Sequence, residues 1–494
     1  MEEAKNMTVA TIAKPPAQRT VNAKRSKKKI VAILPRGESV RNFVYGDALD
    51  LVAQEAEVHL ISCIPNEDTR QMMANRYDSV NEIKLVNERY PARLLREVLD
   101  MSHGRWLWSW AAQDRWRLRD FDAQFSMGDK IKREGKKALC YPFASRTGLR
   151  VLNGAERTVS RVLRNTDEFT NYMKELQPSL VFNGSHVHCN HAIQPVQAAQ
   201  WMGLPTATFI FSWDNLTSQG RIMLPYDYYL TWSEDMRSQM LDIYRHIDGE
   251  RVFVTGTPQF DFHFQPQYHW SREEFCARVG ADPLRPIVLY SSGMVNYMPQ
   301  EMVVVEGIAD MVKNMTSHGK PQLLVRVYPK DRTDRFEDLK RRRPDIIFQH
   351  VNWDQRWLTP LPDDVLMLTN TFLHVDAGIN ISSTMSLELC MFDRPVINVG
   401  YNPPGVDISP VKFADYYKFD HYRPVAESGA INVVYDIKDM PAALANALTN
   451  PSERRQQRHD LIRNMFGKTL DGKSGERVAE RLLELASVGK GKSR

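Results

Sequence analysis

Short apolar runs alternate with helically spaced stretches along most of the chain. The first run, KIVAILP at 29–35, is followed by residues with helical spacing at 40–56 and then by a second run, EVHLIS. A strand–helix–strand alternation is typical of a parallel sheet whose helices cover its faces. Four later apolar runs of the same half are expected to be strands, at 179–185, 206–212, 226–233 and 251–258.

A second alternation begins after an irregular, aromatic and proline-containing stretch at 259–284. It starts with an apolar run at 286–292 and a helical stretch at about 299–318. Because the pattern repeats without a short internal period, the sequence predicts an α/β fold of two doubly wound, Rossmann-like domains facing a cleft. Further strands are expected in the apolar runs at 322–329, 345–350, 365–370, 372–380 and 394–400.

The pattern also predicts the domain boundaries. The basic stretch 1–28 has the composition of a disordered tail, and 489–494 resembles it. The remaining boundaries place a first, acceptor-side domain at 29–265, a linker at 266–284, a second, donor-side domain at 285–465 and a final helix at 466–488 that crosses back to the first domain.

A helical, basic and aromatic insertion interrupts the first domain at about 84–165. Its block 93–120 interleaves four tryptophans with arginines, and Trp106 and Trp110 share a helix face because they are four residues apart. Two interpretations are open. The block packs as an inserted helical pair against the first domain, or it makes a peripheral contact with a membrane surface or a lipid-linked acceptor.

Composition narrows the function classes. The five cysteines are scattered and form no CxxC pair, which argues against a disulfide framework or a structural zinc site and favours the cytoplasm. No apolar run approaches the length of a membrane span. The net charge of +5 lies largely in the tails, so no nucleic-acid partner is expected. G-x-G-x-x-G and Walker A motifs are also absent.

The strongest chemical signal is HVDAGINISSTMSLELCMFDRPVINVG at 374–400. We expect a strand that ends at Asp376, a polar loop, and a helix from about Thr384. Hydroxyl residues at such a turn can expose backbone N–H groups to an anion, so Ser383 and Thr384 are candidates to hold a diphosphate. Glu388 lies one helical turn later and could accept hydrogen bonds from ribose hydroxyls. The alternative is a plain helix cap followed by a surface glutamate.

This segment resembles the donor-binding element of GT-B glycosyltransferases and of the related non-hydrolysing epimerases. The matching strings are I-S-S-T-M-S-L-E-L and D-R-P-V-I, with Asp393 where a glycine is frequent. The resemblance implies that the Ser382–Thr384 turn contacts the donor phosphates and that Glu388 contacts the ribose.

Three further segments carry the same resemblance. VTGTPQFDF at 254–262 resembles the end of the first domain, and IVLYSSG resembles the first strand and loop of the donor domain. LLVRVYPKD resembles a strand ending in R-x-H-P-K, with Tyr328 in place of the histidine. Arg326 and Lys330 are either phosphate partners or members of strand-end salt bridges. The loop residues that the resemblance places at the phosphates are Ser291, Ser292 and Gly293.

An inverting sugar transfer needs a general base on the acceptor hydroxyl. Asp214, in the unusual loop FSWDNLTSQGR, is the first candidate, with an Asx-turn carboxylate as the alternative. His186 and His188, in NGSHVHCNHA, are the second candidates. Their spacing does not match a zinc set, and no metal is expected.

The resemblance implies transfer of a sugar from a nucleotide-activated donor, a UDP-sugar, to a glycan or lipid-linked acceptor during cell-surface polysaccharide synthesis. No cofactor beyond the nucleotide-sugar substrate is expected. Three alternatives remain: a nucleotide-sugar epimerase, a CDP-glycerol-type glycerophosphotransferase, and a non-catalytic scaffold that binds a nucleotide or a glycan.

Overall fold

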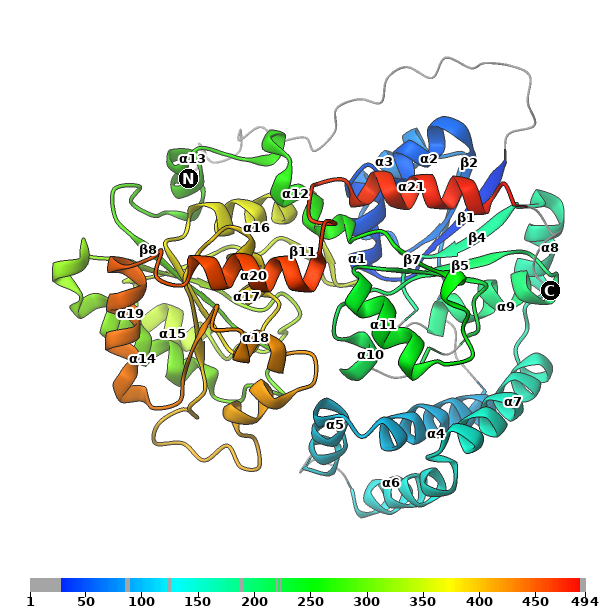
Figure 1. Ribbon diagram of the computed structural model, residues 1–494, viewed down its shortest axis with the longest axis horizontal. Helices are drawn as coiled ribbons and strands as arrows, with labels where there is room; N and C mark the ends of the chain where they lie inside the picture. The colour runs from blue at the N-terminus through cyan, green and yellow to red at the C-terminus, as the bar shows by residue number, and fades with distance from the viewer. Residues whose placement is uncertain are drawn as a thin grey trace.

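The computed structural model describes residues 28–84, 89–121, 126–186, 190–218, 221–222 and 224–488. Two sheets built from parallel strands lie side by side, each covered by helices (Figure 1). The first sheet has the order β3-β2-β1-β4-β5-β6-β7. Its strands are β1 (Lys29–Leu34), β2 (Glu57–Ser62), β3 (Ser79–Glu82), β4 (Leu180–Asn183), β5 (Thr206–Phe209), β6 (Tyr228–Thr231) and β7 (Val252–Val254).

The second sheet has the order β10-β9-β8-β13-β14-β15. A short antiparallel pair, β11 (Trp353–Asp354) with β12 (Thr359–Pro360), stands apart from it. The α/β class with two doubly wound domains is therefore confirmed. The strands of the second sheet are β8 (Ile287–Ser291), β9 (Gln322–Arg326), β10 (Ile346–Phe348), β13 (Ala377–Asn380), β14 (Val396–Val399) and β15 (Asn432–Val434).

Each sheet has a point where the strand order reverses, between β1 and β4 and between β8 and β13. At such a point the loops after the two neighbouring strands diverge to opposite faces and leave a crevice. In the second sheet, register pairs Asn380 with Ser291 and Ser291 with Arg326, so three polar strand ends lie in one row. The predicted phosphate loops therefore start at the topological switch point.

Two strand expectations were wrong. Residues 365–370 belong to helix α16 (Pro362–His374), and the strand that we expected to end at Asp376 begins after it, at Ala377. Pro362 opens this helix, and acidic residues fill its first turn. Such a start stabilises a helix, whereas a short apolar run alone does not distinguish a helix from a strand.

The insertion separates β3 from β4. Its small core joins Val98 and Leu99 of α4 to Leu149 and Leu152 of α7, with Trp106 packed against them. The tryptophan and arginine block thus contributes to the packing of the insertion; its membrane contact remains a prediction. The inserted helices are α4 (Tyr90–Leu107), α5 (Trp110–Phe121), α6 (Met127–Cys140) and α7 (Arg146–Leu163), followed by α8 (Asp167–Leu176).

Helix α20 (Arg455–Phe466) packs against α17 (Met385–Met391) of the second domain. The C-terminal helix α21 (Ser474–Leu485) then returns to the first domain and packs against α2 (Ala48–Glu55) (Figure 1). The segment between β7 and β8 is here called the linker. In its short helix α12 (Asp261–Phe264), the carboxylate of Asp261 accepts the main-chain N–H groups of Ser474 at 3.1 Å and Gly475 at 2.7 Å. The linker and the returning helix are therefore tied together. Within the described ranges, no helix has the length and hydrophobicity needed to span a bilayer.

Candidate functional site

The turn between β13 and α17 (Met385–Met391) occupies the switch point of the second sheet. Ser382 adopts a left-handed backbone conformation with φ of 46°, which bends the chain sharply after the strand. The buried side-chain oxygen of Asn380 accepts the N–H of Ser383 at 3.1 Å and the hydroxyl of Ser386 at 3.0 Å. A buried asparagine therefore fixes the shape of the predicted phosphate turn.

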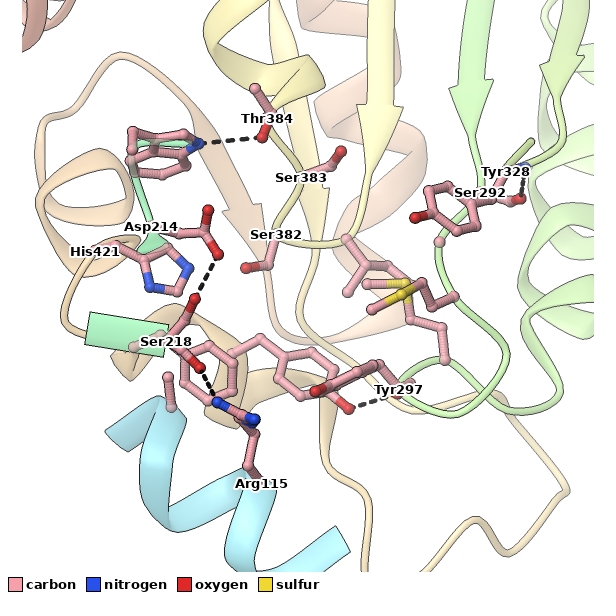
Figure 2. Close-up of a pocket in the computed structure, with 18 residues that line it drawn as sticks. Arg115, Asp214, Ser218, Ser292, Tyr297, Tyr328, Ser382, Ser383, Thr384 and His421 are labelled. Carbon is pink, nitrogen blue, oxygen red and sulfur yellow. Dashed lines mark hydrogen bonds between the residues drawn. The ribbon is translucent and has the colours of Figure 1, made fainter. Parts of the chain in front are cut away.

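Thr384 stands at the start of α17, but its hydroxyl does not cap that helix. It accepts a hydrogen bond of 3.1 Å from the indole nitrogen of Trp213, which belongs to the loop after β5 in the other domain (Figure 2). The structure thus brings together the two unusual loops, S-W-D-N and S-S-T. The simple capping interpretation does not hold for Thr384.

Two cavities lie between the domains and meet at this turn. One has a volume of about 310 Å³ and is lined by residues that include Lys330, Arg326 and Glu388. The other, of about 320 Å³, is lined by residues that include Asp214 and His421 (Figure 2). Both cavities are lined by Ser292, Tyr328, Ser383 and Thr384. We call them the Glu388 cavity and the Asp214 cavity.

Glu388 is a buried residue, so the surface-glutamate alternative is wrong. Its Oε2 lies 2.9 Å from Nε2 of His263 in the linker helix, and Nδ1 of His263 lies 3.1 Å from the hydroxyl of Thr369. Within the described residues, Oε1 of Glu388 has no hydrogen-bond partner. One carboxylate oxygen is therefore anchored to the linker, and the other is left for a ligand in the cavity.

The Glu388 cavity combines cations from both domains. Lys330 pairs with Glu38, across the cleft from it, and Arg41 bonds to Gln259 on the first domain. Burial alone would raise the pKa of Glu38, but the charges of Lys330 and Arg36 outweigh burial and lower it to about 2. For Lys330, burial has the opposite effect and lowers the pKa. Among the residues that line this cavity, the cations Arg41, Arg326 and Lys330 are matched by the carboxylates Glu38, Asp364 and Glu388.

Arg326 also borders the Glu388 cavity, but its guanidinium is engaged within the second domain. It bonds to the Asp364 carboxylate at 2.6 Å and to the Gln349 side chain at 2.9 Å, and the Arg326 and Asp364 side chains are almost fully buried. This is the salt-bridge arrangement that the sequence left open for Arg326. Lys330 shows the same arrangement across the cleft.

The Ser291–Gly293 loop lies opposite the phosphate turn. Ser291 borders the Glu388 cavity, and the Ser292 hydroxyl accepts the Tyr328 N–H at 2.9 Å. The N–H of Gly293 is already bonded to the buried Glu301 carboxylate at 3.0 Å. A Cβ at Gly293 would lie 1.8 Å from Sδ of Met298, so a larger residue here would require the flexible Met298 side chain to move.

In the Asp214 cavity, Asp214 accepts a hydrogen bond from the Ser218 hydroxyl beside His421 of the second domain (Figure 2). Burial raises the pKa of Asp214, but the charge of His421 and hydrogen bonds from Ser212 and Ser218 outweigh it, and the net shift is downward. Burial lowers the pKa of His421, opposed by Asp214. Both directions favour an ionised carboxylate beside an imidazole that loses its proton more readily than usual.

The histidine candidates are placed differently. His186 is buried, its Nδ1 lies 3.3 Å from the Phe209 carbonyl oxygen, and it is not among the described residues that line either cavity. His188 lies outside the described residues. The assignment of either histidine as a base remains a prediction.

The sequence did not single out Arg41, His263, His421 or Arg115. Arg115, from the inserted helix α5, borders the Asp214 cavity and donates to the Ser218 carbonyl oxygen at 2.8 Å (Figure 2). These residues come from a π-helical turn, a linker, a loop and an insertion, none of which forms a contiguous motif.

No protein-family model and no curated protein matches the chain. Solved structures do. S. aureus MnaA in a co-structure with UDP is 12% identical over 94% of this chain and 99% of that chain, with a TM-score of 0.53. The Neisseria meningitidis UDP-GlcNAc 2-epimerase bound to UDP-GlcNAc is 10% identical over 92% and 100%, with a TM-score of 0.51. The Methanocaldococcus jannaschii enzyme of that name is 13% identical over 92% and 99%, also at 0.51. At such identities the likeness establishes the architecture, and the chain has the GT-B fold.

Proposed function

We propose that the chain is a glycosyltransferase that moves a sugar from a UDP-sugar to a hydroxyl of a glycan or lipid-linked acceptor. The observation that carries this proposal is the pair of cavities that meet at the Ser383–Thr384 turn. A nucleotide sugar has two unlike parts joined by a diphosphate. Two chambers that share a hydroxyl-lined junction match that division.

The Glu388 cavity suits the nucleotide. The free Oε1 of Glu388 can accept hydrogen bonds from ribose hydroxyls, because its partner oxygen is already held by His263. Lys330 and Arg41 supply positive charge for a diphosphate whose oxygens meet the Ser383 and Thr384 hydroxyls. The fold neighbours whose titles print UDP or UDP-GlcNAc support a uracil nucleotide in this role.

The Asp214 cavity suits the reacting sugar and acceptor. Of this pair, His421 is the proposed proton acceptor, because burial lowers its pKa and favours the neutral imidazole, which has a ring nitrogen able to accept a proton. In the proposed step, His421 takes the proton of the acceptor hydroxyl and the acceptor oxygen bonds to the anomeric carbon. The bond from that carbon to the diphosphate oxygen breaks, and UDP leaves with the electron pair. Asp214 stabilises the charged imidazolium.

Calorimetry with UDP, CDP, CMP and GDP tests the donor site. UDP is expected to bind, and Glu388→Ala is expected to weaken binding by about 1–3 kcal/mol, the loss typical of a hydrogen bond to a charged group. Glu427→Ala, at the exposed end of α18 (Arg423–Glu427), is the matched control and should leave affinity unchanged. Equal affinity in wild type and Glu388→Ala would remove the donor-site assignment and favour a scaffold.

A turnover assay separates the remaining activities. A transferase releases free UDP in proportion to acceptor glycosylated, whereas an epimerase returns an intact nucleotide sugar. A glycerophosphotransferase would instead release CMP from CDP-glycerol. Stoichiometric UDP release with an acceptor supports the proposal, and either of the other product patterns contradicts it.

A further inference from the structure

Exposed apolar side chains concentrate on the helical insertion. Of the fifteen large apolar side chains that are exposed in the described chain, nine lie between Tyr90 and Val162. On the outer face of α6, Met127 and Ile131 are four residues apart, and Ile131 is 66% exposed; on α7, Val151 and Val162 lie three turns apart, and Val162 is 78% exposed. Isolated exposed apolar residues need no explanation, but such a concentration on one module does.

The same two helices are strongly basic. Residues 126–164 contain ten lysines and arginines against three aspartates and glutamates. Arg150, Arg157 and Arg161 recur at helical spacing on one exposed stripe of α7, beside the stripe that carries Val151 and Val162. Within the described part of the chain, no carboxylate forms an ion pair with these three arginines. They project free positive charge next to exposed apolar groups.

We propose that the outer faces of α6 and α7, here together called the basic face, dock on an anionic lipid bilayer. Arginines beside partly projecting apolar side chains match an interface where lipid headgroups carry negative charge and the acyl region begins just below them. A polyanion would not use Ile131 or Val162. A folded protein partner typically meets a continuous apolar patch with few charges at its centre, whereas here cations separate the apolar residues. This face is distinct from the 93–120 block.

The insertion also connects the basic face to the site. Helix α4 packs on α5, α6 and α7, and α5 directs Arg115 and Ala111 into the Asp214 cavity. Helix α5 also bonds to the second domain, where the Trp110 N–H donates to the Asp420 carboxylate at 2.7 Å. Docking would therefore hold the Asp214 cavity close to the bilayer. If the proposed function holds, the acceptor would then be linked to a lipid. The docking itself does not depend on the proposed function.

Co-sedimentation of the whole chain with vesicles tests the docking. Vesicles of phosphatidylcholine alone should bind weakly, and vesicles that also contain phosphatidylglycerol should bind at least about tenfold more tightly at low salt, because each basic residue adds favourable surface attraction. Arg150→Glu with Arg157→Glu should abolish that gain, and Ile131→Ser with Val162→Ser should weaken binding about tenfold. Arg341→Glu on the second domain and Leu284→Ser in the linker, where Leu284 is 92% exposed, are matched controls and should bind as wild type does.

The vesicles contain no nucleotide, so failure of docking and failure of the donor site are separate results. UDP calorimetry and thermal unfolding on the same variants show that fold and donor site are intact. The proposal is overturned if wild type ignores anionic vesicles or if the basic-face variants bind them equally. It is also overturned if wild type self-associates in sedimentation velocity and these substitutions abolish that, because the face would then bind a second copy.

Discussion

The indole nitrogen of Trp213 donates a hydrogen bond of 3.1 Å to Oγ1 of Thr384, across the boundary between the two domains. Trp213 also contacts His421 edge to face, with ring centroids 5.2 Å apart. A hydroxyl that accepts from an indole is polarised to donate onward. The hydrogen of the Thr384 hydroxyl is thus left to donate to another group, and the domain contact and the proposed donor site share one atom.

Trp213→Phe removes this hydrogen bond but keeps an aromatic side chain at this position. We expect UDP affinity to fall by about 0.5–1.5 kcal/mol, the net value of one hydrogen bond. In a Thr384→Val background the same substitution should cost almost nothing, because the acceptor is already gone. Calorimetry of both single variants and the double variant measures the coupling. Additive effects would show that Trp213 acts on the nucleotide independently of Thr384.

The Asp214–His421 pair predicts a pH dependence of turnover. If neutral His421 is the base, the rate rises with pH through the pKa of His421. The charge of Asp214 raises that pKa, so Asp214→Asn should move the rising limb to lower pH while retaining part of the activity. His421→Gln should lower turnover by about 10²–10⁴-fold, the usual contribution of general base catalysis, with UDP affinity unchanged. A limb that stays in place in Asp214→Asn would contradict the pairing.

The two-domain alternation was predictable because parallel strands buried on both faces leave continuous apolar runs such as KIVAIL and IVLYS, both buried along almost their whole length. β3 and β15 were not predicted, because SVNE and NVV carry little apolar signal. The run at 365–370 was misassigned because its helical start signals lay upstream. The role of Asp393 could not be predicted from its local sequence. It adopts a left-handed backbone conformation with φ of 54°, and its carboxylate pairs with Arg458 at 2.7 Å.

The site was predictable only where its residues are contiguous. The Ser382–Thr384 turn and Glu388 form one string on one strand–helix connection, so their convergence follows from local structure. His263, Arg41 and His421 reach the cavities through the packing of the linker, the first domain and an irregular loop. Contacts that depend on tertiary packing produce no recognisable spacing pattern in the sequence. The hydrogen bond between Trp213 and Thr384, for example, joins residues 171 positions apart.

The buried pair of Arg326 and Asp364 predicts a stability effect rather than a binding effect. Arg326→Met would leave the Asp364 carboxylate buried without its opposite charge. The carboxylate would keep the hydrogen bond of 2.6 Å from the Trp353 indole N–H. The free energy of unfolding should fall by about 3–5 kcal/mol. Arg326→Met with Asp364→Asn should recover part of it, because the uncompensated charge is gone. Denaturant unfolding checks both. A large loss of UDP affinity without loss of stability would instead assign Arg326 to the donor.

Asp261 predicts how stability varies with acidity. Burial raises its pKa to about 6 in the folded chain, despite hydrogen bonds from Ser474 and Gly475, against an ordinary value of 3.8. The folded state therefore binds more protons than the unfolded state between about pH 4 and pH 6, and stability falls as pH rises through that window. Two units of pKa correspond to roughly 3 kcal/mol at most.

Asp261→Asn keeps an acceptor for the N–H groups but cannot ionise, so its unfolding free energy should vary less with pH over this range. Denaturant titrations of both proteins at several pH values measure the difference, with Asp248→Asn, at the start of the 3₁₀ turn Gly249–Arg251, as the control. Parallel curves for wild type and Asp261→Asn would show that the contact between the linker and α21 does not titrate in this window.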